Sequence, residues 1–154
     1  MATSTKEQPS IEDLAQWFLS KAPMTHKKLQ KLCYYAVAWG YALYGKQIFK
    51  DDSFEAWIHG PVSPTLYQKY KNNGWEIIKQ SKKTPNFSEE TTYLLESVWK
   101  TYGDKNGDEL EAISHKEAPW KEARKGLAED ERGSNTISPK IMTTFYKSIY
   151  TGED

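Results

Sequence analysis

The chain has 154 residues, and its 21 lysine and arginine residues balance 21 aspartate and glutamate residues, so the formal net charge is zero. This length predicts one domain that buries about 68–70% of the surface exposed by the unfolded chain. The balanced charge disfavours a protein that binds nucleic acid or anionic lipid through a positive field. The longest apolar run is far shorter than the roughly 20 residues of a membrane span, and the polar N-terminus lacks the regions of a signal peptide, so we expect a cytoplasmic protein without membrane association.

The N-terminal part of the chain predicts two helices after a disordered segment, residues 1–9. Ser10 begins a capping box with Asp13, and apolar residues at helical spacing follow it. Thr25 caps a second and longer helix. This helix is expected to continue until Gly45, because glycine readily adopts the left-handed conformation that ends many helices.

A change from helical to alternating spacing predicts a small β-hairpin near residues 47–58. The apolar segments 47–49 and 54–58 flank the polar, turn-prone segment 50–53. Because an isolated two-stranded hairpin is only marginally stable in water, we expect this one to pack against the helices through its aromatic residues.

The rest of the chain is predicted to be mostly helical. Ser63 and Pro64 have the residue types of an N-cap and a first helical position, and they begin a short helix that ends at residues 72–74. Further helices are predicted over residues 88–103, 108–115 and 119–125 and from residue 139 onward, and no element is assigned to residues 75–87.

Together these elements predict a mainly α fold of the α+β type. We expect a single-domain compact bundle of about six to seven helices with one small β-hairpin. The domain is expected to span residues 10–150, between the disordered segment 1–9 and a C-terminal tail, residues 151–154.

Residue types that carry catalysis or bind metals do not occur in recognisable patterns. His26, His59 and His115 lie on separate segments without the short spacing of zinc ligands. Cys33 falls in the middle of the longest predicted helix, where a cysteine is most often a core residue. We therefore predict no catalytic residue, no cofactor and no metal site, and a protein that is not an enzyme.

Lysines and tyrosines near the start of the second predicted helix form the candidate partner-binding surface. The lysines Lys27, Lys28 and Lys31 are followed by Tyr34 and Tyr35. Charge clusters are usually solvated faces, but aromatic residues beside positive charges also suit protein interfaces. Both interpretations stay open, and the second predicts an acidic protein partner.

One bend in the predicted hairpin region combines a large ring, a glycine and a proline. Gly60 permits close approach of the backbone, Pro61 keeps the preceding residue extended, and Trp57 is a large anchor. We interpret this bend as a rigid turn that docks the hairpin on the helices, and we expect Trp120 and His115 to pack near it.

Three segments of the chain resemble the signatures of a known family. They read TxxKLQKLxYY from residue 25, FEAWxHGPV from residue 54 and SHxExPWKxAR from residue 114. In this order they resemble the Panacea domain, the SocA-like or GepA-like antitoxin family, over about residues 11–150. We assign a scaffold role to the motif residues Thr25, Leu29, Gln30, Leu32, Phe54, Glu55, Ala56, Trp57, His59, Gly60, Pro61, Val62, Ser114, His115, Glu117, Pro119 and Trp120.

The resemblance implies a mainly helical antitoxin of a bacterium, phage or prophage that neutralises a protein toxin by contact and not by catalysis. We expect the adjacent gene to encode the toxin. One alternative is an adaptor that delivers the toxin to an energy-dependent protease, and another is an enzyme that uses Glu55, His59 or His115 as general acid or base. A transcriptional regulator is disfavoured because no helix-turn-helix with a basic face stands out, so nucleic acid is not an expected partner.

Overall fold

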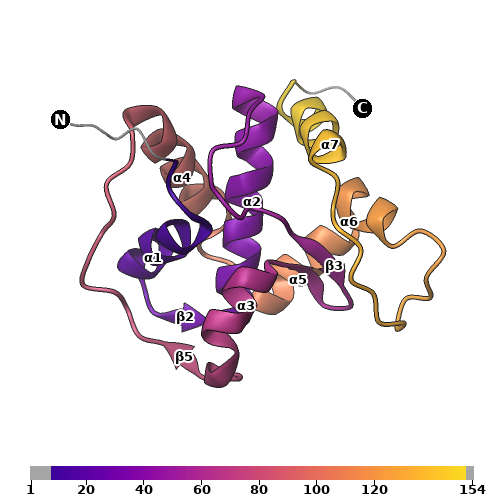
Figure 1. Cartoon of the computed structure of the whole chain (residues 1–154), viewed down its shortest axis with the longest axis horizontal. Coiled ribbons are helices and arrows are strands. Elements are labelled where there is room, and N and C mark those ends of the chain that lie inside the picture. Colours follow the sequence, from indigo (N-terminus) through magenta and orange to yellow (C-terminus); the bar gives the residue numbers. More distant parts are fainter. Residues whose placement is uncertain (1–7, 152–154) are drawn as a thin grey trace.

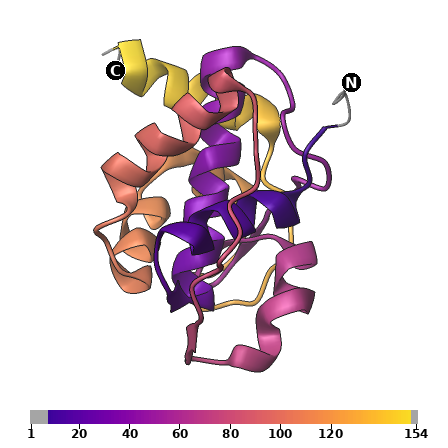
Figure 2. The same cartoon turned by 90° about the vertical axis from the view of Figure 1, so that its left-hand side faces the viewer.

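A long helix, α2, runs through the middle of the fold, and the other helices surround it (Figure 1, Figure 2). The computed structural model describes residues 8–151, and its mainly helical architecture with two small antiparallel sheets confirms the predicted fold class. In chain order, the elements within these residues are α1 (Ile11–Lys21), β2 (Met24–Thr25), α2 (His26–Tyr44), β3 (Glu55–Trp57), β4 (Gly60–Val62), α3 (Pro64–Tyr70), the 3-10 helix η1 (Lys71–Asn73), β5 (Ile77–Ile78), α4 (Glu89–Tyr102), α5 (Gly107–His115), α6 (Ala118–Ala123) and α7 (Pro139–Thr151).

The caps and the burial of α2 explain its central position. Thr25 Oγ1 accepts a hydrogen bond from Lys28 N at 3.2 Å in the first turn, and Gly45 ends the helix in the left-handed conformation, with a φ of 65°. Both caps confirm the prediction. α1 and α4 lie on one side of α2, whereas α5, α6 and α7 lie on the other (Figure 1). Residues 29–38 are accordingly all buried, as expected for a helix surrounded by neighbours.

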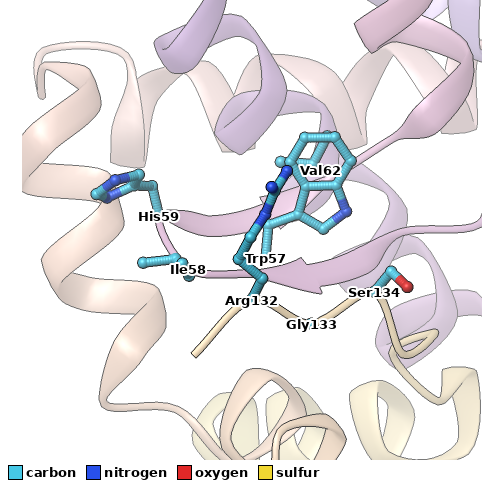
Figure 3. Close-up of a pocket in the computed structure, with 7 residues that line it drawn as sticks. All are labelled: Trp57, Ile58, His59, Val62, Arg132, Gly133 and Ser134. Carbon is cyan, nitrogen blue, oxygen red and sulfur yellow. The ribbon is translucent and has the colours of Figure 1, made fainter. Parts of the chain in front are cut away.

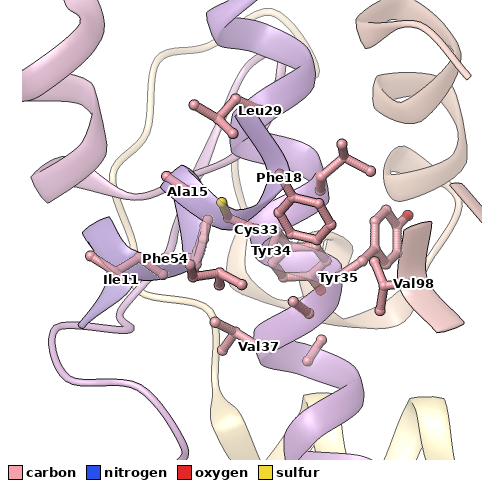
Figure 4. Close-up of a cluster of buried hydrophobic side chains, with 14 of the residues drawn as sticks. Ile11, Ala15, Phe18, Leu29, Cys33, Tyr34, Tyr35, Val37, Phe54 and Val98 are labelled. Carbon is pink, nitrogen blue, oxygen red and sulfur yellow. The ribbon is translucent and has the colours of Figure 1, made fainter. Parts of the chain in front are cut away.

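The hydrophobic core forms around the middle turns of α2 (Figure 4). Tyr34 and Tyr35 of α2, Phe18 of α1 and Phe54 before β3 are all buried in it, and each large side chain that is fully buried contributes about 1.5–3 kcal/mol. Cys33 lies in the same core, as predicted. Burial raises the pKa of its thiol well above the usual value, so the thiol stays protonated.

The β-hairpin lies later in the chain than the sequence predicted. β3 pairs with β4 in antiparallel register, with Trp57 opposite Gly60. The predicted strand over residues 47–49 is wrong, because this segment leads into a bridge with the chain that precedes α1. There, Lys50 N donates a hydrogen bond to Pro9 O at 2.8 Å.

The position of β3 explains why the hairpin forms with the later partner. A short turn joins β3 directly to β4, so the loop that must be closed is shorter than the predicted one. The other edge of β3 also finds a partner, because Ala56 N donates to Asn135 O at 2.9 Å and Ile137 N donates to Phe54 O at 2.8 Å. Both edges of β3 are thus hydrogen-bonded, which buried backbone groups require.

A second small sheet joins β2 to β5, with Met24 opposite Ile78. Its strands have two residues each, which is too short to give an alternating pattern, and the sequence therefore assigned no element to residues 75–87. The predicted helices all occur, with ends that differ by up to two residues. α6, for example, spans Ala118–Ala123 instead of residues 119–125.

The predicted chain ends fall partly outside the described residues. Residues 1–7 and 152–154 lie outside them, so the disordered segment and the C-terminal tail stay predictions, and only residues 8, 9 and 151 of these segments are described. Gln8 Nε2 donates a hydrogen bond to Gln47 O at 3.1 Å, and Thr151 is the last residue of α7. The single domain over residues 10–150 stays a prediction. No helix within residues 8–151 is long and apolar enough to cross a membrane.

Candidate functional site

Side chains from two distant segments hold the backbone of the hairpin. Trp120 Nε1 donates a hydrogen bond to Trp57 O at 2.8 Å, and Arg124 Nη1 donates to Ala56 O at 2.9 Å. On the other strand, Lys31 Nζ donates to Pro61 O at 3.2 Å. The hairpin therefore uses side chains from α2, α6 and the C-cap of α6 as partners for carbonyl groups that a two-stranded sheet leaves open.

Aromatic packing reinforces these hydrogen bonds. The ring of His115 stacks on Trp120, with a centroid distance of 3.9 Å and an interplanar angle of 13°. The ring of Trp57 meets Tyr67 of α3 edge to face at 4.9 Å, and its indole Nε1 donates to Glu55 Oε1 at 2.8 Å. The bend and the later Pro-Trp segment thus lie together, where the sequence analysis placed them.

Gly60 is needed at the bend for both conformational and steric reasons. Its φ of 108° lies in the region that side chains rarely adopt, and a Cβ atom there would lie 2.8 Å from Lys31 Cε and 3.2 Å from Ser114 Oγ. The glycine lets the hairpin backbone cross directly over α2 and the end of α5. These contacts give Lys31 and Ser114, which belong to the two other motif segments, a structural role.

Gln30 fixes the exit from the hairpin into α3. Its Oε1 accepts a hydrogen bond from Ser63 N at 2.7 Å, and its Nε2 donates to Ser63 O at 3.2 Å. Ser63 also caps α3, since its Oγ accepts a hydrogen bond from Leu66 N at 3.1 Å. The remaining apolar motif residues, Leu29, Leu32, Phe54, Ala56 and Val62, are buried.

Glu111 of α5 forms ion pairs with two positively charged or titratable side chains beside the hairpin. Lys27 Nζ contacts Glu111 and lies 2.6 Å from Asp108 Oδ1, while His59 Nδ1 lies 3.0 Å from Glu111 Oε2. Burial alone would raise the pKa of Glu111, but hydrogen bonds from Lys27 and His59 lower it overall. Glu111 is therefore ionised and occupied by its partners, which makes it a weak general base.

His115 is enclosed beside this charge cluster. Its Nε2 is buried without a hydrogen-bond partner among residues 8–151 and lies 3.8 Å from Glu111 Oε2. Burial lowers the pKa of His115, although the nearby Glu111 carboxylate opposes this shift. The imidazole is therefore neutral at pH 7 and serves as a ring packed on Trp120.

A buried hydrogen-bond network lies deeper, between α2, α7 and the start of α6. Glu117 Oε1 accepts hydrogen bonds from Tyr35 at 2.8 Å and from Tyr146 at 2.7 Å, and the hydroxyl of Tyr146 lies 3.0 Å from that of Tyr34. Tyr35 also stacks on Tyr102 at 4.1 Å. Burial raises the pKa of Glu117, against the lowering effect of the two hydrogen bonds.

This network corrects the predicted partner-binding surface. Lys31, Tyr34 and Tyr35 are buried, so the expectation that they are exposed is wrong. α2 is enclosed by its neighbours along its middle turns, where residues 29–38 are all buried. Lys27 and Lys28 are partly exposed and Lys31 lines a cavity, and for these three the partner-binding role stays a prediction.

Two cavities border the hairpin, each of about 430 Å³, and they share Trp57, His59 and Val62. The first, the Arg132 cavity, extends to the segment 132–134 (Figure 3). The second extends between α2 and α3 and is called here the Lys31 cavity. It is lined by His26, Lys27, Gln30, Lys31, Trp57, His59, Val62, Tyr67, Lys71, Gly74 and Trp75.

Sequence reasoning missed Trp75, the most exposed large apolar side chain at these cavities. Its side chain is 82% exposed, and it lines the Lys31 cavity. The sequence does contain a signal for this exposure. Trp75 follows Gly74, the residue that ends η1, and it does not belong to an amphipathic helix pattern that would bury it. Among residues 8–151, no group of three or more His, Cys, Asp or Glu residues could hold a metal ion.

Comparison with known proteins agrees with the resemblance seen in the motifs. The sequence model of the family described as antitoxin SocA-like, Panacea domain, matches residues 29–121, which is more than half of the chain. The chain belongs to this family of SocA-like antitoxins. No curated protein and no solved structure matched it.

Proposed function

We propose that this protein is the antitoxin of a toxin–antitoxin pair and that it neutralises its toxin by direct binding. The observation that carries the proposal is the family match over residues 29–121. The structure supports a role in binding, because the motif residues hold the hairpin on the helices and leave Glu55, Trp57 and His59 at least partly exposed. We further propose that the adjacent gene encodes the toxin and that the two proteins meet in the cytoplasm.

The surface around the Lys31 cavity is the proposed toxin-binding face. An interface of standard size covers about 800 Å² on each partner, and a few large aromatic residues near its centre usually supply most of the affinity. Trp75, with its exposed ring, is such a residue, and Trp57 and Tyr67 line the hollow beside it. Lys27 stands at the same cavity.

The histidines support this interpretation over an enzymatic one. His59 is exposed and paired with Glu111, and His115 is stacked on Trp120, so each has a structural partner. Because His59 also lines the Lys31 cavity, we expect any effect of His59→Asn on neutralisation to follow its effect on toxin binding. A His59→Asn variant that folds, binds the toxin and fails to protect cells would support a catalytic role instead.

Co-expression tests the proposal. Cells that produce the toxin should stop growing, and the antitoxin should restore growth and co-purify with the toxin as a stable complex. Absence of both rescue and complex would reject the proposal. The half-life of the toxin separates the two modes of binding, since masking leaves the half-life unchanged, whereas delivery to a protease shortens it.

A further inference from the structure

The residues that line the Lys31 cavity carry positive charges and no negative charge. Lys27, Lys31 and Lys71 line it, and its lining contains no aspartate or glutamate. Lys27 is balanced by carboxylates of α5 outside the cavity. Lys31 and Lys71 make no salt bridge with any carboxylate of residues 8–151, although the Glu111 carboxylate beside Lys27 acts on Lys31 from a longer distance, in the direction that raises its pKa.

Lys31 is the most unusual of these charges because its side chain is only 2% exposed. An ammonium group has three donors, and within residues 8–151 that of Lys31 has one protein acceptor, Pro61 O. A buried charge is costly unless it is paired. Burial, followed by the charge of Lys27, lowers the pKa of Lys31 to about 7, and an arriving carboxylate would stabilise its charged form.

The polar neighbours of Lys31 are already occupied. Gln30 uses its amide on Ser63 and on His26 Nε2, which lies 3.0 Å from Gln30 Nε2. Burial, with a further effect of the Lys31 charge, lowers the pKa of His26 to about 4, so this imidazole is neutral at pH 7. An anion entering the cavity would therefore meet Lys31 and Lys71 as its charged partners.

The apolar part of the cavity is aromatic and open at one edge. Trp57 and Tyr67 form a packed pair, and the exposed Trp75 stands at the rim. Exposed apolar surface rimmed by polar residues marks interaction sites. A volume of about 430 Å³ accommodates a few side chains of a peptide segment, in the range of pockets that enclose small ligands.

We infer that the Lys31 cavity receives an acidic segment of the toxin. An apolar side chain of this segment packs against Trp57 and Trp75, and a neighbouring carboxylate pairs with Lys31 and Lys71. The inference rests on the proposed function and adds the place of contact and the chemistry of the partner. The observation that supports the inference is that Lys31 and Lys71, which make no salt bridge within residues 8–151, lie beside the exposed ring of Trp75.

Affinities of purified complexes test the inference. Trp75→Ala and Lys71→Glu change exposed residues, so they should leave folding intact. Each should weaken toxin binding by about 30-fold or more, the effect typical of central interface residues. The matched controls, Tyr93→Ala and Lys79→Glu, replace exposed residues that do not line the cavity and should change the dissociation constant by less than threefold.

A charge exchange identifies the carboxylate. The toxin variant in which the contacting aspartate or glutamate becomes lysine should bind the wild-type antitoxin weakly and should regain affinity for Lys71→Glu. Lys31→Met keeps the approximate volume of the side chain but removes its charge and its hydrogen bond to Pro61 O, so we expect a lower thermal transition. At a temperature where the variant is folded, its affinity for the toxin should still be about tenfold lower or more.

The outcomes separate the inference from the function on which it rests. If the wild-type antitoxin does not bind the toxin at all, the proposed function fails. If it binds, and Trp75→Ala and Lys71→Glu bind equally well, the toxin docks elsewhere and only the inference is overturned. Micromolar binding of inorganic phosphate or succinate to the isolated antitoxin, abolished in Lys31→Met, would instead define a small-anion site and would also overturn it.

Discussion

At the scale of single residues, Trp120 joins two of the motif segments through one indole N–H group. Replacing Trp120 by Phe keeps a ring on His115 but removes the hydrogen bond to Trp57 O. This hydrogen bond is partly buried, and such a bond contributes about 0.5–1.5 kcal/mol. We therefore expect Trp120→Phe to lower the free energy of unfolding by about this amount in urea denaturation.

Trp75→Phe is the matched control for this measurement. Trp75 is exposed, and substitutions at such positions usually change stability by less than about 0.5 kcal/mol. Equal and small effects of Trp120→Phe and Trp75→Phe would show that the Trp120 hydrogen bond does not hold the hairpin in place.

Glu117 gives a prediction for the pH dependence of stability. Its pKa is raised above the usual 4.5, chiefly by burial, so in the window above pH 4.5 the folded protein binds more protons than the unfolded chain. Stability attributable to Glu117 is then lost as the pH rises through this window. Glu117→Gln keeps an oxygen for Tyr35 and Tyr146 but does not titrate.

Urea titrations across this pH range measure the effect. As the pH rises above 4.5, the free energy of unfolding of Glu117→Gln should increase relative to that of the wild type. The difference should become constant above the pKa of Glu117 in the folded protein. A difference that is constant with pH, or that runs in the opposite direction, would contradict the assigned shift.

At the scale of elements, the hairpin depends on Gly60. Gly60→Ala forces a side chain into a disfavoured φ and against Lys31, and we expect a loss of about 2–4 kcal/mol in the free energy of unfolding from strain and overpacking. Gly45→Ala is the control, because its φ is also positive but no atom lies within 4 Å of the added Cβ. It should cost only about 1 kcal/mol, and equal costs would remove the steric argument.

The helices could be predicted from the sequence because their signals are local. Ser10, Thr25, Ser63 and Ser88 all accept the expected hydrogen bond at a helix start, and apolar residues at helical spacing follow each of them. The hairpin partner could not be chosen in the same way. Its choice depends on contacts with residues 135–137, which are far away in the sequence.

The site was predicted in part. The association of Trp57 with Trp120 and His115 followed from large rings placed beside glycine and proline turns, and the structure brings these residues together. The exposure of Lys31 could not be judged, because a lysine in an apolar helix face normally extends to solvent. Gly60 and Pro61 cover it here, and this cover comes from another part of the chain.

At the scale of the whole molecule, the helices packed around α2 hold the hairpin and the edge of the Lys31 cavity, where Trp75 lies, at the surface. The hairpin is bonded to α2 and to the α6 segment, and the core is one cluster of apolar residues. Interfaces with a rigid binding surface lose little free energy to ordering on association. We therefore expect the toxin to bind a surface that is already formed.

Stoichiometry tests the central claim, neutralisation by contact, most directly. Purified toxin at a concentration far above the dissociation constant is titrated with the antitoxin while toxin activity is measured. Neutralisation by binding predicts that activity falls in a straight line and reaches zero at a fixed molar ratio, with no dependence on incubation time. Complete inactivation by a small fraction of that amount, progressing with time, would show catalysis and would contradict the account.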